Sequence, residues 1–178
     1  NRLGIPPAKA NEKYPGIPEE SRDLEADALI TLGKARISPI NMANAYASLA
    51  NGGEAAQLYL IEKVVDESGE TRYRHKVSTE RALDEDMTSD VSYALQQVVQ
   101  NGTGTEALAF GCPVAGKTGT AALRPDTVTS AWFAGYSPDR VAVVWVGRDD
   151  NTPAKLSGSR HALPIWTAFM QAVRPAGG

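Results

Sequence analysis

Five consecutive residues, Gly116-Lys117-Thr118-Gly119-Thr120, combine a cation, two hydroxyls and two glycines. They fit two incompatible kinds of chemistry. Residues 111–118 match the pattern G-x-x-x-x-G-K-T, a loop that cradles nucleotide phosphates. Taken alone, Lys117-Thr118-Gly119 is an element of enzymes that transfer acyl groups through a serine. The elements around the motif must decide between these interpretations.

A phosphate-binding loop needs a helix directly after it, because the helix N terminus and its backbone N–H groups bind the phosphates. Gly119 and Pro125 follow Lys117 too closely for a useful helix to begin there. Pro113 also removes one N–H from the supposed cradle. The apolar run 141–146, with two aspartates after it, follows too soon for a helix to connect parallel strands. The residues therefore disfavour the nucleotide-binding interpretation.

Strand patterns surround the motif instead. Residues 114–121, 129–136 and 140–146 predict three strands, and Ser137-Pro138-Asp139 predicts the last turn. Strands joined by short connections pair antiparallel, so Lys117 and both threonines would lie on one strand that faces a cleft. The alternative is that Lys117 is an ordinary solvated lysine of that strand.

Helices and a hairpin complete the prediction. Ser38 and Pro39 predict a helix start, and Asn51-Gly52-Gly53 predicts its end. Residues 58–66 and 71–75 predict a hairpin turned at Ser68-Gly69. A second helix is expected to begin near Thr88 or Ser89 and to end at Asn101-Gly102-Thr103-Gly104. A third is expected over 164–173. The apolar faces expected for these two helices comprise Val91, Leu95, Val98 and Val99, and then Ile165, Trp166, Phe169 and Val173.

Two interpretations of the glycines in 102–104 stay open: a left-handed helix cap, or contact with a substrate. Residues 1–30 are rich in proline and charge and predict an irregular arm, whereas 31–178 carry the helices and strands. The elements together indicate an α/β fold of the α+β type, in which helices flank an antiparallel sheet.

Six ordered blocks of sequence stand out between residues 37 and 149: Ile37–Tyr46, Ala50–Gly53, Gln97–Thr105, Ala115–Thr120, Trp132–Pro138 and Val144–Asp149. Together they resemble the C-terminal part of the transpeptidase domain of class A (bifunctional) penicillin-binding proteins. Lys117-Thr118-Gly119 is the K-T-G element of that family and of the serine β-lactamases. The last two blocks resemble the bifunctional class more than the monofunctional one.

The resemblance implies a penicillin-binding, serine β-lactamase-like transpeptidase fold and cross-linking of peptidoglycan. An activated serine would attack the D-Ala–D-Ala bond of a stem peptide, release the last D-alanine and pass the acyl group to an amine. Lys117, Thr118 and Thr120 would hold the substrate carboxylate, and the N–H of Thr120 would be one oxyanion-hole donor. Gly119 would let the substrate backbone approach. Alternation along a strand places Lys117 and Thr120 on opposite faces, so they converge only if the strand twists or lies at the cleft edge.

The sequence departs from the family in one respect. The family carries its nucleophile in S-x-x-K and a second serine in S-x-N, both before K-T-G. Neither pattern occurs at any serine of these 178 residues, and Thr31-Leu32-Gly33-Lys34 has the wrong nucleophile. We therefore expect the chain to be a piece of a longer protein and to be inactive alone. The preceding part of the same polypeptide would be its partner.

Composition limits the remaining functions. The net charge is -3 with both signs interspersed, so we expect no nucleic-acid partner. Lone histidines and the single Cys112 predict neither metal nor cofactor. The resemblance implies peptidoglycan stem peptides and β-lactam antibiotics as ligands. It also implies an accompanying glycosyltransferase, an N-terminal membrane anchor and a place on the periplasmic side of the bacterial membrane.

Two rival functions stay open. One is a D,D-carboxypeptidase or serine β-lactamase, which shares K-T-G but hydrolyses its acyl-enzyme. The other is a non-catalytic peptidoglycan-binding module that keeps the wall of the cleft without a serine.

Overall fold

A computed structural model of the chain describes Leu3, Gly33 and residues 37–122 and 127–174. Apart from Leu3, the irregular arm predicted at residues 1–30 lies outside the described residues. Within them, no helix combines the length and the apolar character needed to cross a membrane.

The centre of the fold is an antiparallel sheet of three strands in the order β5-β6-β7, as predicted. The strands are β5 (Ala115–Ala122), β6 (Val128–Tyr136) and β7 (Val141–Gly147). The predicted turn between β6 and β7 is closed by the bond from the Ser137 N–H to the Arg140 carbonyl (2.9 Å). β6 is the central strand, and β5 pairs with no other strand among the described residues.

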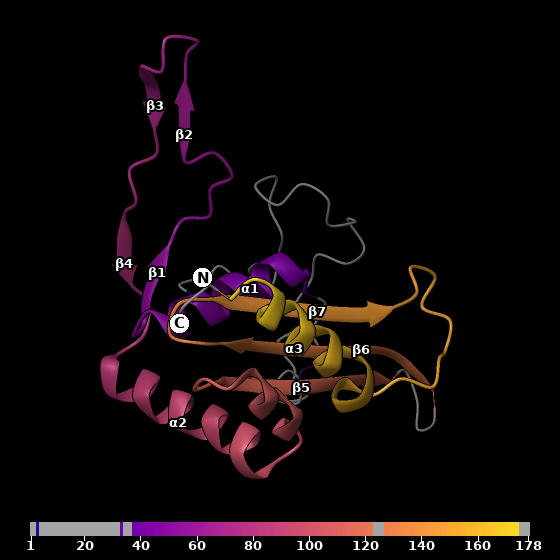
Figure 1. Ribbon diagram of the computed structural model, residues 1–178. Helices are drawn as coiled ribbons and strands as arrows, with labels where there is room; N and C mark the ends of the chain where they lie inside the picture. Colours follow the sequence, from indigo (N-terminus) through magenta and orange to yellow (C-terminus); the bar gives the residue numbers. More distant parts are fainter. Residues whose placement is uncertain (1–2, 4–32, 34–36, 123–126, 175–178) are drawn as a thin grey trace.

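Helices cover the two faces of this sheet (Figure 1). On one face, Trp166 of α3 (Leu163–Ala172) packs edge-on against Phe133 of β6, with ring centroids 5.1 Å apart. On the other face, Tyr46 of α1 (Pro39–Ala50) packs edge-on against Tyr136, at 6.3 Å. Phe133 and Tyr136 are three residues apart on one strand and so point to opposite faces. We call these two surfaces of the sheet the α3 face and the α1 face.

The hydrophobic core lies under α3. The indole N–H of Trp166 also donates to the Ala142 carbonyl at 3.0 Å, which fixes the helix on the sheet. The apolar face predicted for this helix is wrong in part, because Ile165 and Phe169 are about half exposed. The buried side follows an i, i+3, i+4, i+7 pattern, consisting of Leu163, Trp166, Thr167 and Met170. The helix is apolar nearly all round, so its sequence does not select one face.

Helix α2 (Glu85–Asn101) lies beside β5, and the 3-10 helix η3 (Thr105–Phe110) follows it. The predicted start near Thr88 is too late. Asp84 has extended backbone at the N-cap, and Glu85 and Asp86 occupy the first turn, where their charge favours the helix dipole. Val99 is buried as expected, but Val91 is exposed.

The start of α1 is as predicted: Ser38 is its N-cap and accepts the N–H of Asn41 at 3.3 Å. Two short ribbons follow this helix and form an arm that projects away from the sheet (Figure 1). The hairpin of β2 (Lys63–Val65) and β3 (Thr71–Arg74) confirms the prediction, although its strands are shorter. The pairing of β1 (Glu54–Ala56) with β4 (Thr79–Arg81) was not predicted.

Asp66 organises the turn between β2 and β3. Its carboxylate accepts hydrogen bonds from Ser68, Glu70 and Arg72. The Ser68 hydroxyl is the main cause of a lowered pKa for this carboxyl, and the neighbouring bonds lower it further. Gly69 has φ +85°, as a tight turn requires. The hairpin is thus held by polar contacts at its tip.

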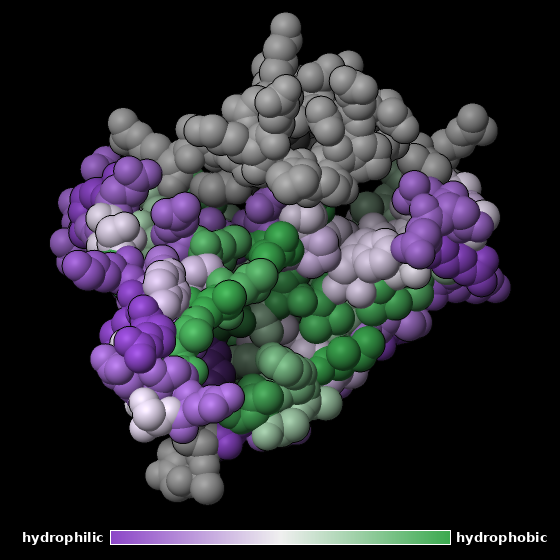
Figure 2. Space-filling view, turned by 90° about the horizontal axis from the view of Figure 1, so that it is seen from above, coloured by the Kyte–Doolittle hydropathy of each residue, from purple (hydrophilic) through white to green (hydrophobic). Residues whose placement is uncertain are grey.

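Seen from the β7 side of the sheet, Figure 2 shows hydrophobic side chains gathered across the middle of the surface, between polar margins. β7 is almost wholly apolar, and all of its residues are only half buried. The described part of the chain therefore leaves an apolar surface on this side of the sheet.

Candidate active site

Lys117 lies on β5 opposite Ala134, on the α1 face of the sheet, and its side chain is exposed. Its ammonium donates to the carbonyl of the next residue, Thr118, at 2.9 Å. None of the ion pairs among the described residues includes Lys117. The site thus holds a cation whose charge no described carboxylate neutralises.

Thr118 and Thr120 lie on the α3 face, opposite Phe133 and Ala131. The alternation expected from the sequence is therefore present, with Lys117 on one face and both threonines on the other. Because β5 is an edge strand of the described sheet, side chains from both faces border the same unpaired edge. The edge position is one of the two arrangements under which the sequence allows Lys117 and Thr120 to converge on one substrate.

The hydroxyl of Thr120 is held from the α3 side. The backbone N–H of Gly158 donates to Thr120 Oγ1 at 3.1 Å. Gly158 begins the π-helix η4 (Gly158–Ala162), which leads into α3. A Cβ atom on Gly158 would lie 2.6 Å from the Trp132 carbonyl oxygen and 2.7 Å from that of Gly119. Only glycine fits here, and no motif in the sequence marked this position.

The hydroxyl of Thr118 is held from the loop after α2, where Thr103 Oγ1 lies 2.6 Å from Thr118 Oγ1. Of the two interpretations of the loop glycines, the left-handed cap is wrong, because φ is -114° at Gly102 and -102° at Gly104. These glycines instead allow close packing, since a Cβ on Gly102 would lie 2.9 Å from the Val98 carbonyl oxygen. Thr103 was part of a recognised block, but its contact was not predicted.

The glycines of the motif make room for aromatic side chains of β6. A Cβ on Gly116 would lie 2.7 Å from the ring of Phe133, and one on Gly119 would lie 3.1 Å from Cβ of Trp132. Trp132 in turn packs edge-on against Trp145 of β7, at 6.4 Å. These contacts give the glycines a packing reason in addition to the role that the resemblance implies for Gly119.

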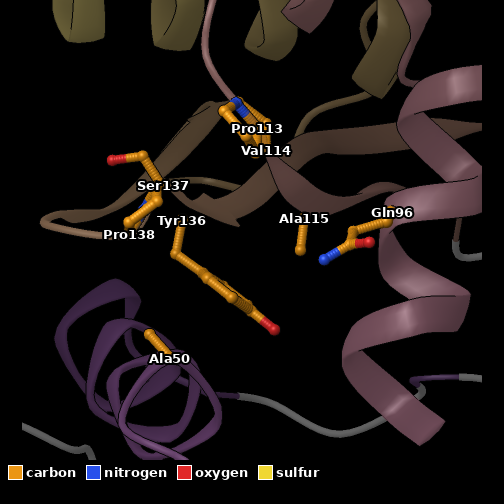
Figure 3. A pocket seen from close by; sticks show the side chains of 8 residues that line it. All are labelled: Ala50, Gln96, Pro113, Val114, Ala115, Tyr136, Ser137 and Pro138. Carbon is orange, nitrogen blue, oxygen red and sulfur yellow. The ribbon is translucent and has the colours of Figure 1, made fainter. Parts of the chain in front are cut away.

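A small recess of about 100 Å³ lies near the start of β5 (Figure 3). Gln96 of α2, Ala50 of α1 and Tyr136 of β6 line it, together with the ends of the neighbouring strands. The hydroxyl of Tyr136 donates to Ser92 Oγ at 2.7 Å. Burial, and secondarily the nearby Tyr136, raises the pKa of Tyr46 to about 12. None of the K-T-G residues lines the recess, so it is not the candidate site.

The structure contradicts the phosphate-loop alternative. Lys117 and Thr118 lie within β5, which continues to Ala122, so no helix N terminus follows them. Among the described residues, no group of three metal-ligating side chains comes together. His75 stacks on Tyr59, and His161 Nδ1 accepts the N–H of Ser157 at 3.0 Å. Both histidines therefore serve local packing, and Cys112 is a free, partly buried thiol.

Comparison with known proteins agrees with this geometry. Residues 5–171 match the family model "Penicillin binding protein transpeptidase domain". The chain is 34% identical to penicillin-binding protein 1B of Escherichia coli over 171 residues, which is 94% of the chain and 19% of that protein. It is 38% identical to penicillin-binding protein 1A of Aquifex aeolicus over 146 residues, covering 81% of the chain and 20% of that protein.

Solved structures show the same fold. The penicillin-binding protein PonA1 of Mycobacterium tuberculosis superimposes with a TM-score of 0.80 at 25% identity, over 96% of this chain and 46% of that one. A second structure of PonA1, in complex with penicillin V, gives the same TM-score over 99% of this chain and 49% of that one.

The chain belongs to the penicillin-binding protein transpeptidase domain family. The resemblance to class A members and the transpeptidase fold are both confirmed. The chain spans about a fifth of the length of the penicillin-binding proteins 1B and 1A named above, and about half of the PonA1 chains.

Proposed function

We propose that this chain is the K-T-G half of a D,D-transpeptidase that cross-links peptidoglycan. A serine of the same polypeptide, outside these residues, attacks the carbonyl carbon of the penultimate D-alanine. The last D-alanine leaves as its amine, and an amine of a neighbouring stem peptide then takes the acyl group and frees the serine. β-Lactam antibiotics acylate the same serine, in line with the penicillin V complex of PonA1.

The proposal rests on the side chains that lie along the unpaired edge of β5. An exposed ammonium on Lys117 and two oriented hydroxyls on Thr118 and Thr120 border a strand edge that no other described strand occupies. An extended peptide can lie along such an edge as an added strand, and its terminal carboxylate then meets donors that are already in place.

Each residue of the motif has a role in this proposal. Lys117 supplies the charge opposite the substrate carboxylate, and Thr118 and Thr120 donate hydrogen bonds to it. A hydrogen bond to a charged group contributes about 1.5–3 kcal/mol. The backbone N–H of Thr120 donates to the developing oxyanion, where losing one donor typically costs about 2.7–4 kcal/mol of barrier. Gly119 leaves space for the substrate backbone.

The proposal extends to the whole protein. As in class A members generally, we infer a glycosyltransferase domain and a membrane anchor on the same polypeptide, with this domain on the periplasmic side. The S-x-x-K and S-x-N motifs, which these residues lack, belong to the preceding part of the chain. The two parts together form the transpeptidase domain.

A full-length protein tests the proposal. It is incubated with a stem-peptide substrate that ends in D-Ala–D-Ala, with and without an amine acceptor, and the products are resolved by mass spectrometry. A cross-linked product that depends on the acceptor is expected. Hydrolysis of the D-Ala–D-Ala bond alone would instead assign a D,D-carboxypeptidase, and catalytic turnover of penicillin in a parallel assay would assign a β-lactamase. Binding of the peptide without either product would assign a non-catalytic module.

A further inference from the structure

The hydroxyls of Thr103 and Thr118 form a hydrogen-bonded pair that joins the loop after α2 to strand β5. Their Oγ1 atoms are 2.6 Å apart, which is a short distance for an O–H···O hydrogen bond. The two residues are 15 positions apart in the sequence, and both lie at the solvent-accessible side of the strand.

The loop that carries Thr103 is anchored on both sides. The backbone N–H groups of Gly102 and Gly104 each donate to the Val98 carbonyl at 3.0 Å. A Cβ on Gly104 would lie 3.2 Å from that same oxygen, so the loop packs closely on the last turn of α2. Val99 beside it is 1% exposed and belongs to the hydrophobic core. Thr103 is therefore presented to Thr118 by a rigid support.

The hydrogen bond between Thr103 and Thr118 affects which hydroxyl proton stays free for a ligand. A threonine hydroxyl has one proton to donate and two lone pairs that accept. At Thr120 the neighbouring group is a backbone N–H, which only donates, so the proton of Thr120 stays free for a ligand. If Thr103 donates to Thr118, the proton of Thr118 is free in the same way. Two hydroxyls then face the strand edge as donors, as a carboxylate requires.

We propose that Thr103 is a positioning residue, whose hydroxyl donates to Thr118 and so turns the Thr118 proton toward the substrate carboxylate. This inference rests on the proposed function. A donor that itself accepts a hydrogen bond is also polarised, which strengthens the bond that it donates. Thr103 acts through Thr118 and does not touch the reacting atoms.

Three variants of the full-length protein test this role. Thr103→Val removes the hydroxyl at nearly constant shape, and Thr103→Ser keeps the hydroxyl but removes the methyl group. Thr105→Val is the matched control, because Thr105 is exposed two residues further on and its hydroxyl makes no hydrogen bond within the described part of the chain. The readout is the second-order rate of acylation by penicillin, with thermal unfolding measured in parallel.

We expect Thr103→Val to lower the acylation rate about three- to tenfold, in keeping with the loss of one neutral hydrogen bond. Thr103→Ser and Thr105→Val are expected to stay within about twofold of wild type. In a Thr118→Val background, adding Thr103→Val should change the rate less than about twofold, because the partner is already absent. A penicillin methyl ester, which lacks the charged carboxylate, should not distinguish Thr103→Val from wild type.

The inference is overturned if Thr103→Val acylates like wild type. It is also overturned if the effect persists in the Thr118→Val background, or if Thr103→Ser is as slow as Thr103→Val, which would indicate packing. A wild-type protein that penicillin does not acylate would contradict the proposed function itself, and the role of Thr103 would fall with it.

Discussion

The hydroxyl of Thr120 accepts a hydrogen bond from the backbone N–H of Gly158, 38 residues further along the chain, at 3.1 Å. Gly158 also lies against the backbone of Gly119 and Trp132, where a Cβ atom would come within 2.7 Å of both carbonyl oxygens. The entry into α3 is thereby packed directly on the K-T-G strand. The position of this strand depends on a helix that sequence motifs do not connect with it.

We expect Gly158→Ala to move β5 away from η4, because the new methyl group meets backbone atoms that cannot rotate aside. Overpacking of this kind typically costs about 1–3 kcal/mol of stability. Small displacements of positioning groups also slow catalysis, so acylation by penicillin should fall about tenfold or more. Thermal unfolding and acylation rates of the full-length protein measure the two effects.

Ser159→Ala is the control for this substitution, since it changes the next residue of η4 without adding an atom near β5. It should leave both measurements close to wild type. A Gly158→Ala protein with normal stability and normal acylation would show that the contact with Thr120 is not needed.

We expect the ionisation of Tyr46 to lower the stability of the folded protein at high pH. Burial, with a smaller effect of Tyr136, raises the pKa of Tyr46 from 10.0 to about 12. The folded protein therefore keeps the proton between these values while the unfolded chain releases it. The contribution of Tyr46 is complete below about pH 10 and is lost as the pH rises through about 12, by at most about 1.4 kcal/mol per pH unit.

Tyr46→Phe should make the free energy of unfolding less dependent on pH across this range, as measured by urea unfolding at several pH values. Absorbance titration should also show one late-ionising tyrosine fewer. Tyr93→Phe serves as the control, because this side chain is 64% exposed. If Tyr46→Phe and Tyr93→Phe give the same pH profile, Tyr46 does not ionise late.

The 178-residue chain by itself should not react with penicillin, because it contains neither S-x-x-K nor S-x-N. Incubation with a fluorescent penicillin, followed by a denaturing gel and intact-mass analysis, should give no adduct. The full-length protein treated in parallel is expected to give one. A stoichiometric adduct on a serine within these residues would place the nucleophile here and contradict the proposed division of the site.

Sequence reasoning predicted what local patterns encode. The central sheet was predicted from the strand patterns of β5, β6 and β7 and from the turn at Ser137. The family was predicted from the motif blocks. The β1–β4 pairing joins two strands of only three residues, so no local pattern marked it. The buried face of α3 was partly missed because Ile165 and Phe169 are as apolar as the residues that are buried.

The contacts that orient the candidate site were also not predicted. Thr103 reaches Thr118 across 15 residues, and Gly158 reaches Thr120 across 38. Contacts of this kind depend on how the helices pack on the sheet, and neither composition nor periodicity specifies that. The motif indicated which strand matters, and the packing around it determines how its hydroxyls are held.

Penicillin acylation of the full-length Lys117→Ala protein measures whether Lys117 supplies the charge that holds the substrate carboxylate. We predict a rate at least about a hundredfold below wild type, equivalent to about 2.7 kcal/mol, because the charge-assisted bond and the orientation are both lost. Lys117→Arg should restore the rate only partly, since a planar guanidinium does not replace a compact ammonium. Lys63→Ala, an exposed strand lysine on the arm, should match wild type. If folded Lys117→Ala, checked by circular dichroism, acylates within about threefold of wild type, Lys117 does not hold the carboxylate.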